Sequence, residues 1–222
     1  MIQEQKQNFI FLQKEVVYDS YGPIQKIAEP SNNTCSFREV GKTDITFQRG
    51  ILQLAYKKKL EYQHIDIDID VMAIMLDDSE HIKVHKDMIF YNNLNSTNDA
   101  IIHRGDGMGC PCPPNDEFYI SINKIPEYVK EIMLIISIYQ KDAKVIDFSI
   151  FDNIRIRLAT AVSDELYYMD DETIFQYDIP FIPDNTITLH YGSFIREKSS
   201  WFYSNCLVGY NENFENFMKR FL

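Results

Sequence analysis

The sequence predicts an all-β protein, a two-sheet antiparallel β-sandwich with short peripheral helices. Strand-forming residues are frequent, with 14 Tyr and 15 Phe in the chain, and Ile, Phe, Tyr and Thr recur in short runs. Polar segments that suit turns separate these runs, as at 57–59, 77–79 and 183–185. Many short strands divided by turns are typical of an all-β sandwich.

The expected strands follow one another from about residue 44 onward. A short helix is expected at 126–130, because Pro126 suits the first position of a helix. A second helix is expected at 212–221, where Phe214, Phe217, Met218 and Phe221 recur at helical spacing. The strands are expected at 44–56, 62–76, 88–91, 117–122, 132–139, 154–162, 165–169, 174–179, 186–197 and 201–208.

Residues 1–43 differ from the rest, and we expect an N-terminal arm there, followed by a sandwich domain with a C-terminal helix at 44–222. We expect 9–18, which are largely apolar, to dock on the sandwich or on a neighbouring molecule. The arm and the C-terminal helix are therefore the expected contacts with protein partners or with further copies of the chain. For the helix, packing on its own sandwich is the first expectation, and contact with a partner is the alternative.

Charge and apolar patterning exclude several classes of partner. The net charge of −11 argues against a nucleic-acid partner and against anionic membrane surfaces, because both require Lys and Arg. Since no apolar run approaches about 20 residues, we expect no membrane insertion. Residues 3–7 interrupt any amino-terminal signal pattern, so a cytoplasmic location with four reduced cysteines is expected.

The segment 65–70 alternates Ile with Asp. In a strand this alternation places Asp66, Asp68 and Asp70 on one face, with neighbours roughly 6.6 Å apart. Three carboxylates in a line repel one another, and a bound cation such as Ca²⁺ would offset that repulsion. Alternatively, the acids keep a solvated strand from aggregating.

Two further segments could supply the additional oxygen ligands that Ca²⁺ requires. The stretch 105–117 begins and ends with acids and is rich in Gly and Pro between them. Asn92 and Asn93 carry amide oxygens, which are also acceptable Ca²⁺ ligands. A calcium site would therefore join the acidic strand to these two segments.

Several motifs, taken in order, resemble those of the tellurite-resistance (TerD) family. The run from Asp68 to Leu76 resembles the family's Asp-Leu-Asp-x-x-Ala-x-Leu-Leu strand, and 89–94 is similar to its Val-Phe-Tyr-Asn-Asn motif. Residues 103–106 and 115–117 resemble the two ends of its Gly-Asp-Asn…Asp-Asp-Glu loop. The likeness extends over about 44–210.

The resemblance implies a β-sandwich that binds Ca²⁺, takes part in the response to tellurite and other stress, and is not an enzyme. The metal ligands that it implies are Asp68, Asp70, Asn92, Asn93, Asp106, Asp116 and Glu117. The chain departs from the family in the middle of the loop, where Gly107, Pro111 and Pro113 replace oxygen-bearing residues. Asn115 also stands in place of a carboxylate, so one of the family's two sites is expected to be weak or lost.

Other chemistry-bearing residues are expected to serve no catalytic site. His81 and His85 lack the glutamate of a zinc-protease motif, and no Gly-x-Ser-x-Gly sequence occurs. Cys110 and Cys112 lack two further ligands at zinc-site spacing. Arg155, Arg157 and Arg196 could bind an anion, although Arg196 is expected to pair with a carboxylate near Trp201.

Two functions fit these observations. The first is a non-enzymatic, calcium-binding adaptor in stress response or signalling, in which Ca²⁺ orders a surface for a partner. The second is a structural or assembly component that keeps the sandwich while its metal binding is weakened or lost.

Overall fold

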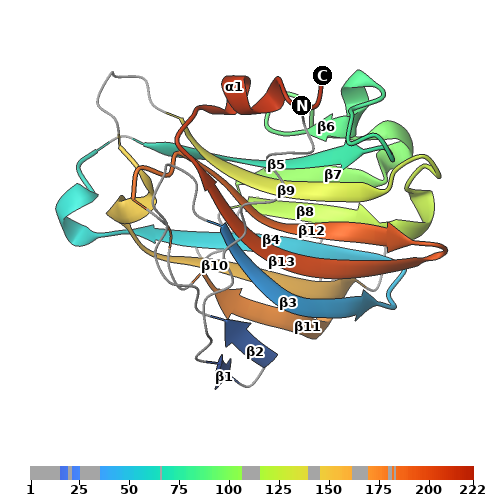
Figure 1. Cartoon of the computed structure of the whole chain (residues 1–222), viewed down its shortest axis with the longest axis horizontal. Coiled ribbons are helices and arrows are strands. Elements are labelled where there is room, and N and C mark those ends of the chain that lie inside the picture. Colours follow the sequence, from blue (N-terminus) through green and yellow to red (C-terminus); the bar gives the residue numbers. More distant parts are fainter. Residues whose placement is uncertain are drawn as a thin grey trace.

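The computed structural model describes residues 16–19, 22–25, 36–65, 67–106, 116–139, 146–161, 170–179, 182 and 184–222. Two stacked sheets form the body of the molecule (Figure 1). All their strand pairs are antiparallel, which confirms the predicted two-sheet β-sandwich.

The first sheet has five strands in the order β11-β10-β4-β8-β7. Their bounds are β11 Asp170–Asp178, β10 Phe151–Ala161, β4 Arg49–Lys58, β8 Asp116–Ser121 and β7 Ile101–Asp106. The second sheet has six strands in the order β3-β13-β12-β9-β5-β6. Their bounds are β3 Ser36–Ile45, β13 Ser200–Tyr210, β12 Thr188–Glu197, β9 Glu131–Tyr139, β5 Asp68–Leu76 and β6 Met88–Ile89.

A small hairpin, one short α-helix and several 3₁₀ turns accompany the two sheets. A separate hairpin pairs β1 (Val16–Asp19) with β2 (Gly22–Gln25). The α-helix α1 (Phe214–Met218) follows β13. Single 3₁₀ turns are η2 Leu60–Tyr62, η3 His85–Asp87, η4 Thr97–Asp99, η5 Ile122–Lys124 and η6 Phe148–Ile150.

From Val71 to Leu76, strand β5 is apolar on both faces, because each face packs against a different layer. Its residues Ile69, Val71, Ala73 and Met75 belong to the main core between the two sheets. The alternate residues Met72, Ile74 and Leu76 belong to a second cluster on the outer face of the six-stranded sheet. Odd-numbered residues of β5 therefore point into the main core, and even-numbered residues from 70 to 76 point to the outer face.

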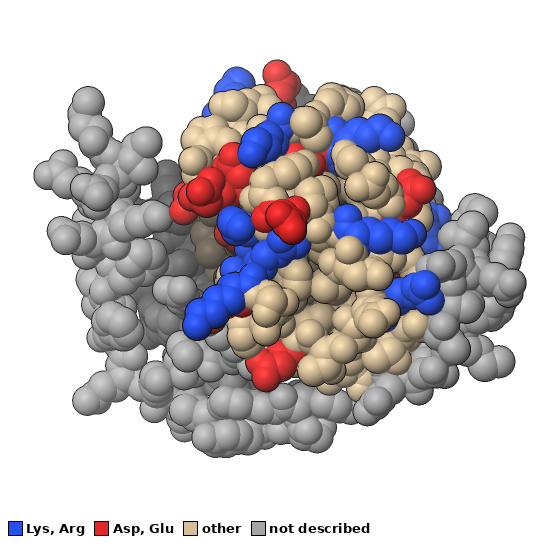
Figure 2. All heavy atoms as spheres, turned by 90° about the vertical axis from the view of Figure 1, so that its right-hand side faces the viewer, with Lys and Arg blue, Asp and Glu red and all other residues tan. Residues whose placement is uncertain are grey.

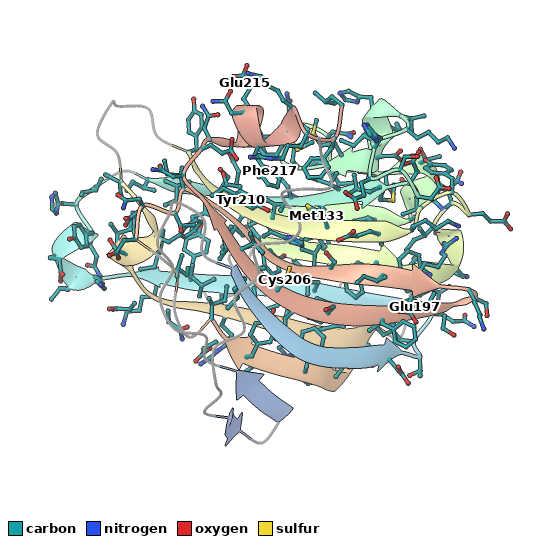
Figure 3. All side chains as sticks on the ribbon, viewed as in Figure 1. Met133, Glu197, Cys206, Tyr210, Glu215 and Phe217 are labelled. Atoms are coloured by element: carbon teal, nitrogen blue, oxygen red, sulfur yellow. The ribbon has the colours of Figure 1, made fainter. Side chains whose placement is uncertain are left out.

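The C-terminal segment covers this second cluster. Phe217, Met218 and Phe221 are buried against the outer face of β5 and β9, and Figure 3 shows Phe217 and Tyr210 between α1 and the sheet. The Asn213 side chain caps α1 by accepting a hydrogen bond from the backbone N–H of Asn216 at 3.0 Å. The helix that periodicity predicts at 212–221 is therefore present, but shorter.

Several predicted elements differ from the observed ones. The segment expected as one strand at 44–56 is divided between β3 and β4, and β3 begins at Ser36, inside the segment expected as an arm. Residues 126–130 contain a turn rather than a helix, with the 3₁₀ turn η5 just before it. The strand expected at 165–169 lies outside the described residues, and so do 1–15, which include most of the segment expected to dock.

Candidate functional site

The carboxylate of Asp70, in β5, lies on the outer face of the six-stranded sheet. Asp70 alternates with Ile69 and Val71, which face the main core, so Asp70 points away from the five-stranded sheet. It stands opposite Ser137 of β9 and is half-buried. Asp68 stands opposite Tyr139 in the same ladder. The Asp68 side chain and all of Asp66 lie outside the described part of the chain.

Asp116 points in the opposite direction, into the core between the sheets. It is only 5% exposed, and His103 Nε2 lies 3.4 Å from its Oδ1. The Nδ1 of His103 accepts a hydrogen bond from the backbone N–H of Gly105 at 3.2 Å. In a neutral ring the proton therefore sits on Nε2, facing Asp116. Gly105 has a φ of 71°, a left-handed conformation that favours glycine at this point.

Glu117, the next residue of β8, faces solvent on the outer side of the five-stranded sheet. Its Oε1 accepts a hydrogen bond from Arg104 Nη1, and its Oε2 accepts one from Gln53 Nε2 at 2.8 Å. Gln53 Oε1 in turn accepts from Arg157 Nη1 at 2.7 Å, and Arg157 donates to Thr173. A polar ladder thus crosses all five strands, and Glu117 is one of its members.

The two asparagines serve a tight turn. Asn93 pairs through its backbone with Phe90, and its side-chain Nδ2 donates to the Met88 carbonyl at 2.6 Å. Asn92 is exposed in the same turn. The Asn93 amide therefore holds the end of β6 in place.

The described candidate ligands do not converge on one point. Asp70, Asp116 and Glu117 face three different surfaces, and Ca²⁺ needs six to eight oxygens around a single centre. Within the described ranges no group of three or more His, Cys, Asp or Glu side chains could hold a metal ion. Asp106 stands opposite Asp116 in the β7–β8 ladder, but its side chain and 107–115 lie outside these ranges. The described side chains alone thus do not fit a calcium site, and ligation by Asp68 and Asp106 stays a prediction.

A second polar cluster, which the sequence analysis missed, crosses the outer face of β9, β12 and β13. Ser193 Oγ donates to Glu131 Oε1 at 2.6 Å and lies 2.8 Å from His190 Nε2. Cys206 Sγ lies 3.2 Å from the same nitrogen. Its four members come from three strands and follow no recognisable motif, so spacing could not reveal them.

A β-bulge brings His190 and Ser193 to the same face. The register shifts between His190 and Gly192, so that Tyr191 and Gly192 both face inward. Residue 192 must be glycine, because a Cβ there would collide with the hydroxyl of Tyr203. That hydroxyl lies 2.7 Å from the hydroxyl of Tyr177 in the core.

Burial determines the charge of this cluster. Desolvation lowers the pKa of His190 to about 4, although a hydrogen bond with the Gly192 carbonyl opposes the shift. Desolvation also raises the pKa of Glu131, against the opposing hydrogen bond from Ser193. The imidazole is therefore neutral near pH 7, and the cluster stabilises the sheet face as a hydrogen-bonded network.

The sequence also led to predictions for Arg196, for the cysteines and for membrane insertion. Among the described residues, Arg196 pairs with no carboxylate: it donates to the Ile125 and Glu127 carbonyls at 3.1 Å and lies 4.6 Å from the Trp201 ring centre. Backbone carbonyls of the turn that precedes β9 take the place of the expected acid. Cys110 and Cys112 lie outside the described residues. Within the described residues, no helix is both long and apolar enough to cross a membrane.

Comparison with known proteins agrees with the fold. A family model described as the TerD domain matches residues 39–221. The tellurium resistance protein TerD of Serratia marcescens is 26% identical over 147 residues, covering 65% of this chain and 72% of that protein. The general stress protein 16U of Bacillus subtilis (strain 168) is 25% identical over 146 residues, covering 65% and 72%.

Solved structures share the architecture at low sequence identity. A homologue of the telluride resistance protein TerD from Streptomyces coelicolor A3(2) superposes with a TM-score of 0.60 at 12% identity, covering 78% of this chain and 95% of that chain. At this identity the likeness shows the fold alone. Because the family model spans most of the sequence, this chain belongs to the TerD domain family.

Proposed function

We propose that this TerD-domain protein acts in a stress response as a non-catalytic binding module whose sandwich does not depend on Ca²⁺. The observation that carries the proposal is the engagement of Asp116 and Glu117 by His103 and Arg104 on opposite faces of β8. The names of two relatives, tellurium resistance protein and general stress protein, support the stress role.

The internal partners of these carboxylates compete with any metal. A Ca²⁺ ion at Glu117 would have to displace the Arg104 guanidinium and the Gln53 amide, which hold the ladder together. An ion at Asp116 would have to enter the interior, where the side chain is 7% exposed. The first step costs hydrogen bonds that the protein already makes, and the second costs the desolvation of the ion.

A calcium-binding adaptor is the second candidate, and the spacing of Asp68 and Asp70 along β5 favours it. As alternate positions of a strand, they are roughly 6.6 Å apart along its backbone. In this candidate Asp106 and the segment after it complete the coordination. Calcium would then bind without Asp116 or Glu117.

Partner binding is assigned to the surface where α1 meets the segment around β6. Tyr91 is 63% exposed there, and its ring packs on Phe90 with centroids 5.3 Å apart. Phe90 in turn packs against Phe214 of α1 at 6.3 Å. Leu222, at the end of the chain, is 78% exposed. Exposed aromatic and aliphatic side chains beside a rigid element suit contact with a protein.

Cell survival tests this function. We expect a bacterium lacking TerD-domain proteins to survive tellurite better when it produces this chain, while the purified protein consumes no tellurite over time. Replacing Tyr91 and Leu222 together by Ser should abolish the protection, because the partner surface loses its apolar contacts.

Leu60→Ser is the matched control, since Leu60 is 79% exposed and belongs to η2, away from α1. It should leave protection intact. Turnover of tellurite by the purified protein, or equal loss of protection in the control, would contradict the proposal.

A further inference from the structure

The outer face of the five-stranded sheet contains a depression of about 320 Å³. We call Ala55 of β4 its floor, because the methyl group of Ala55 is the shortest side chain in the lining. Gln53 and Lys57 flank Ala55 on the same strand, and Asn153, Arg155 and Arg157 border it from β10. Small-molecule sites are about 300–1,000 Å³, so the depression has room for a small metabolite.

Strand register explains why these side chains surround Ala55. In the β4–β10 ladder, Ala55 stands opposite Arg155, Gln53 opposite Arg157 and Lys57 opposite Asn153. Alternate residues of both strands point to the same outer face. The polar ladder through Gln53 and Arg157 forms one wall, and the pair of Lys57 and Asn153 forms the other.

The depression is positively charged in a protein whose net charge is −11. Three cationic side chains, those of Lys57, Arg155 and Arg157, line it together with amides, and its lining within the described chain includes no carboxylate. Positive charge gathered from two neighbouring strands attracts an anion, and a partly enclosed surface strengthens that attraction. The end of the sandwich with the β12–β13 turn differs, because acidic and basic side chains are interspersed there (Figure 2).

Cross-strand pairing balances one of the three cations, because Arg155 stands opposite Asp178 in the β10–β11 ladder. On the β4 side, Lys57 faces an amide and Arg155 faces a methyl group. Arg155 is held on its other side by Asp178, which accepts from Nε at 2.6 Å and from Nη2 at 3.1 Å. This arrangement fixes the guanidinium plane of Arg155 beside the depression, and the Arg155 hydrogen bonds hold the pKa of Asp178 below its ordinary value.

We propose that this depression is a binding site for a small oxyanion ligand carrying a phosphate or carboxylate group. Lys57 supplies charge, and Arg155 presents a guanidinium whose position Asp178 fixes, since both groups donate well to such oxygens. The side-chain amides of Gln53, Asn153 and Gln176 can donate to further oxygens of the ligand. Ala55 admits the ligand because any larger residue would fill the floor.

Calorimetric titration of the full chain with inorganic phosphate and, separately, with citrate tests the site. We expect at least one of the two anions to bind, and the one that binds identifies the source as phosphate or carboxylate. Lys57→Gln removes one charge, and Ala55→Leu fills the floor without changing charge. Each should weaken binding about tenfold or more, because a charged hydrogen bond or the space for the ligand is lost.

Lys124→Gln is the control of equal charge, since Lys124 is exposed in η5 and does not line the depression. It should change the affinity by less than about twofold, because distant surface charges are screened by salt. Backbone amide NMR shifts at 53–57 and 153–157 on phosphate or citrate addition check the location without any variant. Absence of binding by both anions, equal weakening in Lys124→Gln, or unchanged binding in Ala55→Leu would overturn the proposal. The anion site and the proposed stress role can be tested separately. Lys57→Gln can abolish anion binding while the protein still protects cells against tellurite.

Discussion

Phe217→Ala is expected to lower the free energy of unfolding by about 3–5 kcal/mol. The Phe217 ring is 0% exposed and packs between Tyr210, at 4.8 Å, and Phe221, at 5.3 Å. Truncation leaves a cavity above Met72 and Ile74 that the short helix cannot fill. Because single domains are stable by only about 5–15 kcal/mol, the variant should unfold at much lower urea concentration than the wild type.

Leu222→Ala provides the control, because this neighbouring side chain is 78% exposed. Its free energy of unfolding should stay within about 0.5 kcal/mol of the wild-type value. Equal stability of Phe217→Ala and the wild type would show that α1 does not hold the outer sheet face. The packing of Figure 3 would then be incorrect.

Acid should destabilise the protein through His190. Its pKa is about 4 in the folded state against an ordinary value of 6.5, so the folded protein excludes a proton that the unfolded chain accepts. The stabilising contribution is fully present above pH 6.5 and is lost as the pH falls towards 4. Between pH 7 and pH 5 we expect this residue to remove about 2 kcal/mol from the free energy of unfolding.

The matched variant is His190→Gln, which keeps a polar side chain and removes the titration. We expect the free energy of unfolding, measured with urea, to fall between pH 7 and pH 5 in both proteins. The fall should be about 2 kcal/mol smaller in the variant than in the wild type. The raised pKa of Glu131 changes the free energy of unfolding with pH in the opposite direction. Because Glu131 is present in both proteins, its contribution cancels when the variant is compared with the wild type. Identical pH dependence of the two proteins would refute the buried neutral imidazole.

Sequence patterns predicted the sandwich well because most strands carry an apolar face or two. Strands such as β9, at Glu131–Tyr139, appear as long apolar runs, and the expected range of 132–139 nearly matches. Strand β7 was missed, since Ile101–Asp106 has only two apolar residues followed by polar ones and Gly105. Hydrogen bonding to β8 stabilises β7 as a strand, although its own composition does not favour one.

The candidate site was less predictable, because strand parity and cross-strand partners decide it. Motif resemblance gathered Asp70, Asp116 and Glu117 into one ligand set, whereas alternation within β5 and β8 sends their side chains to separate surfaces. The partners Arg104 and His103 become visible only when β7 is placed beside β8. Similarly, no spacing in the sequence joins His190 to Cys206.

Thermal unfolding with 1 mM CaCl₂ or with EDTA measures whether the stability of the sandwich depends on calcium. We predict melting temperatures within about 1 °C of each other, and an equal melting temperature of Asp116→Asn in both buffers. Calcium at 100 times its dissociation constant would add about 2.7 kcal/mol and raise the melting temperature by roughly 5–10 °C. Such a rise, abolished by Asp116→Asn, would show that the sandwich depends on calcium. A rise that survives in Asp116→Asn but not in Asp70→Asn would establish the calcium-binding adaptor instead.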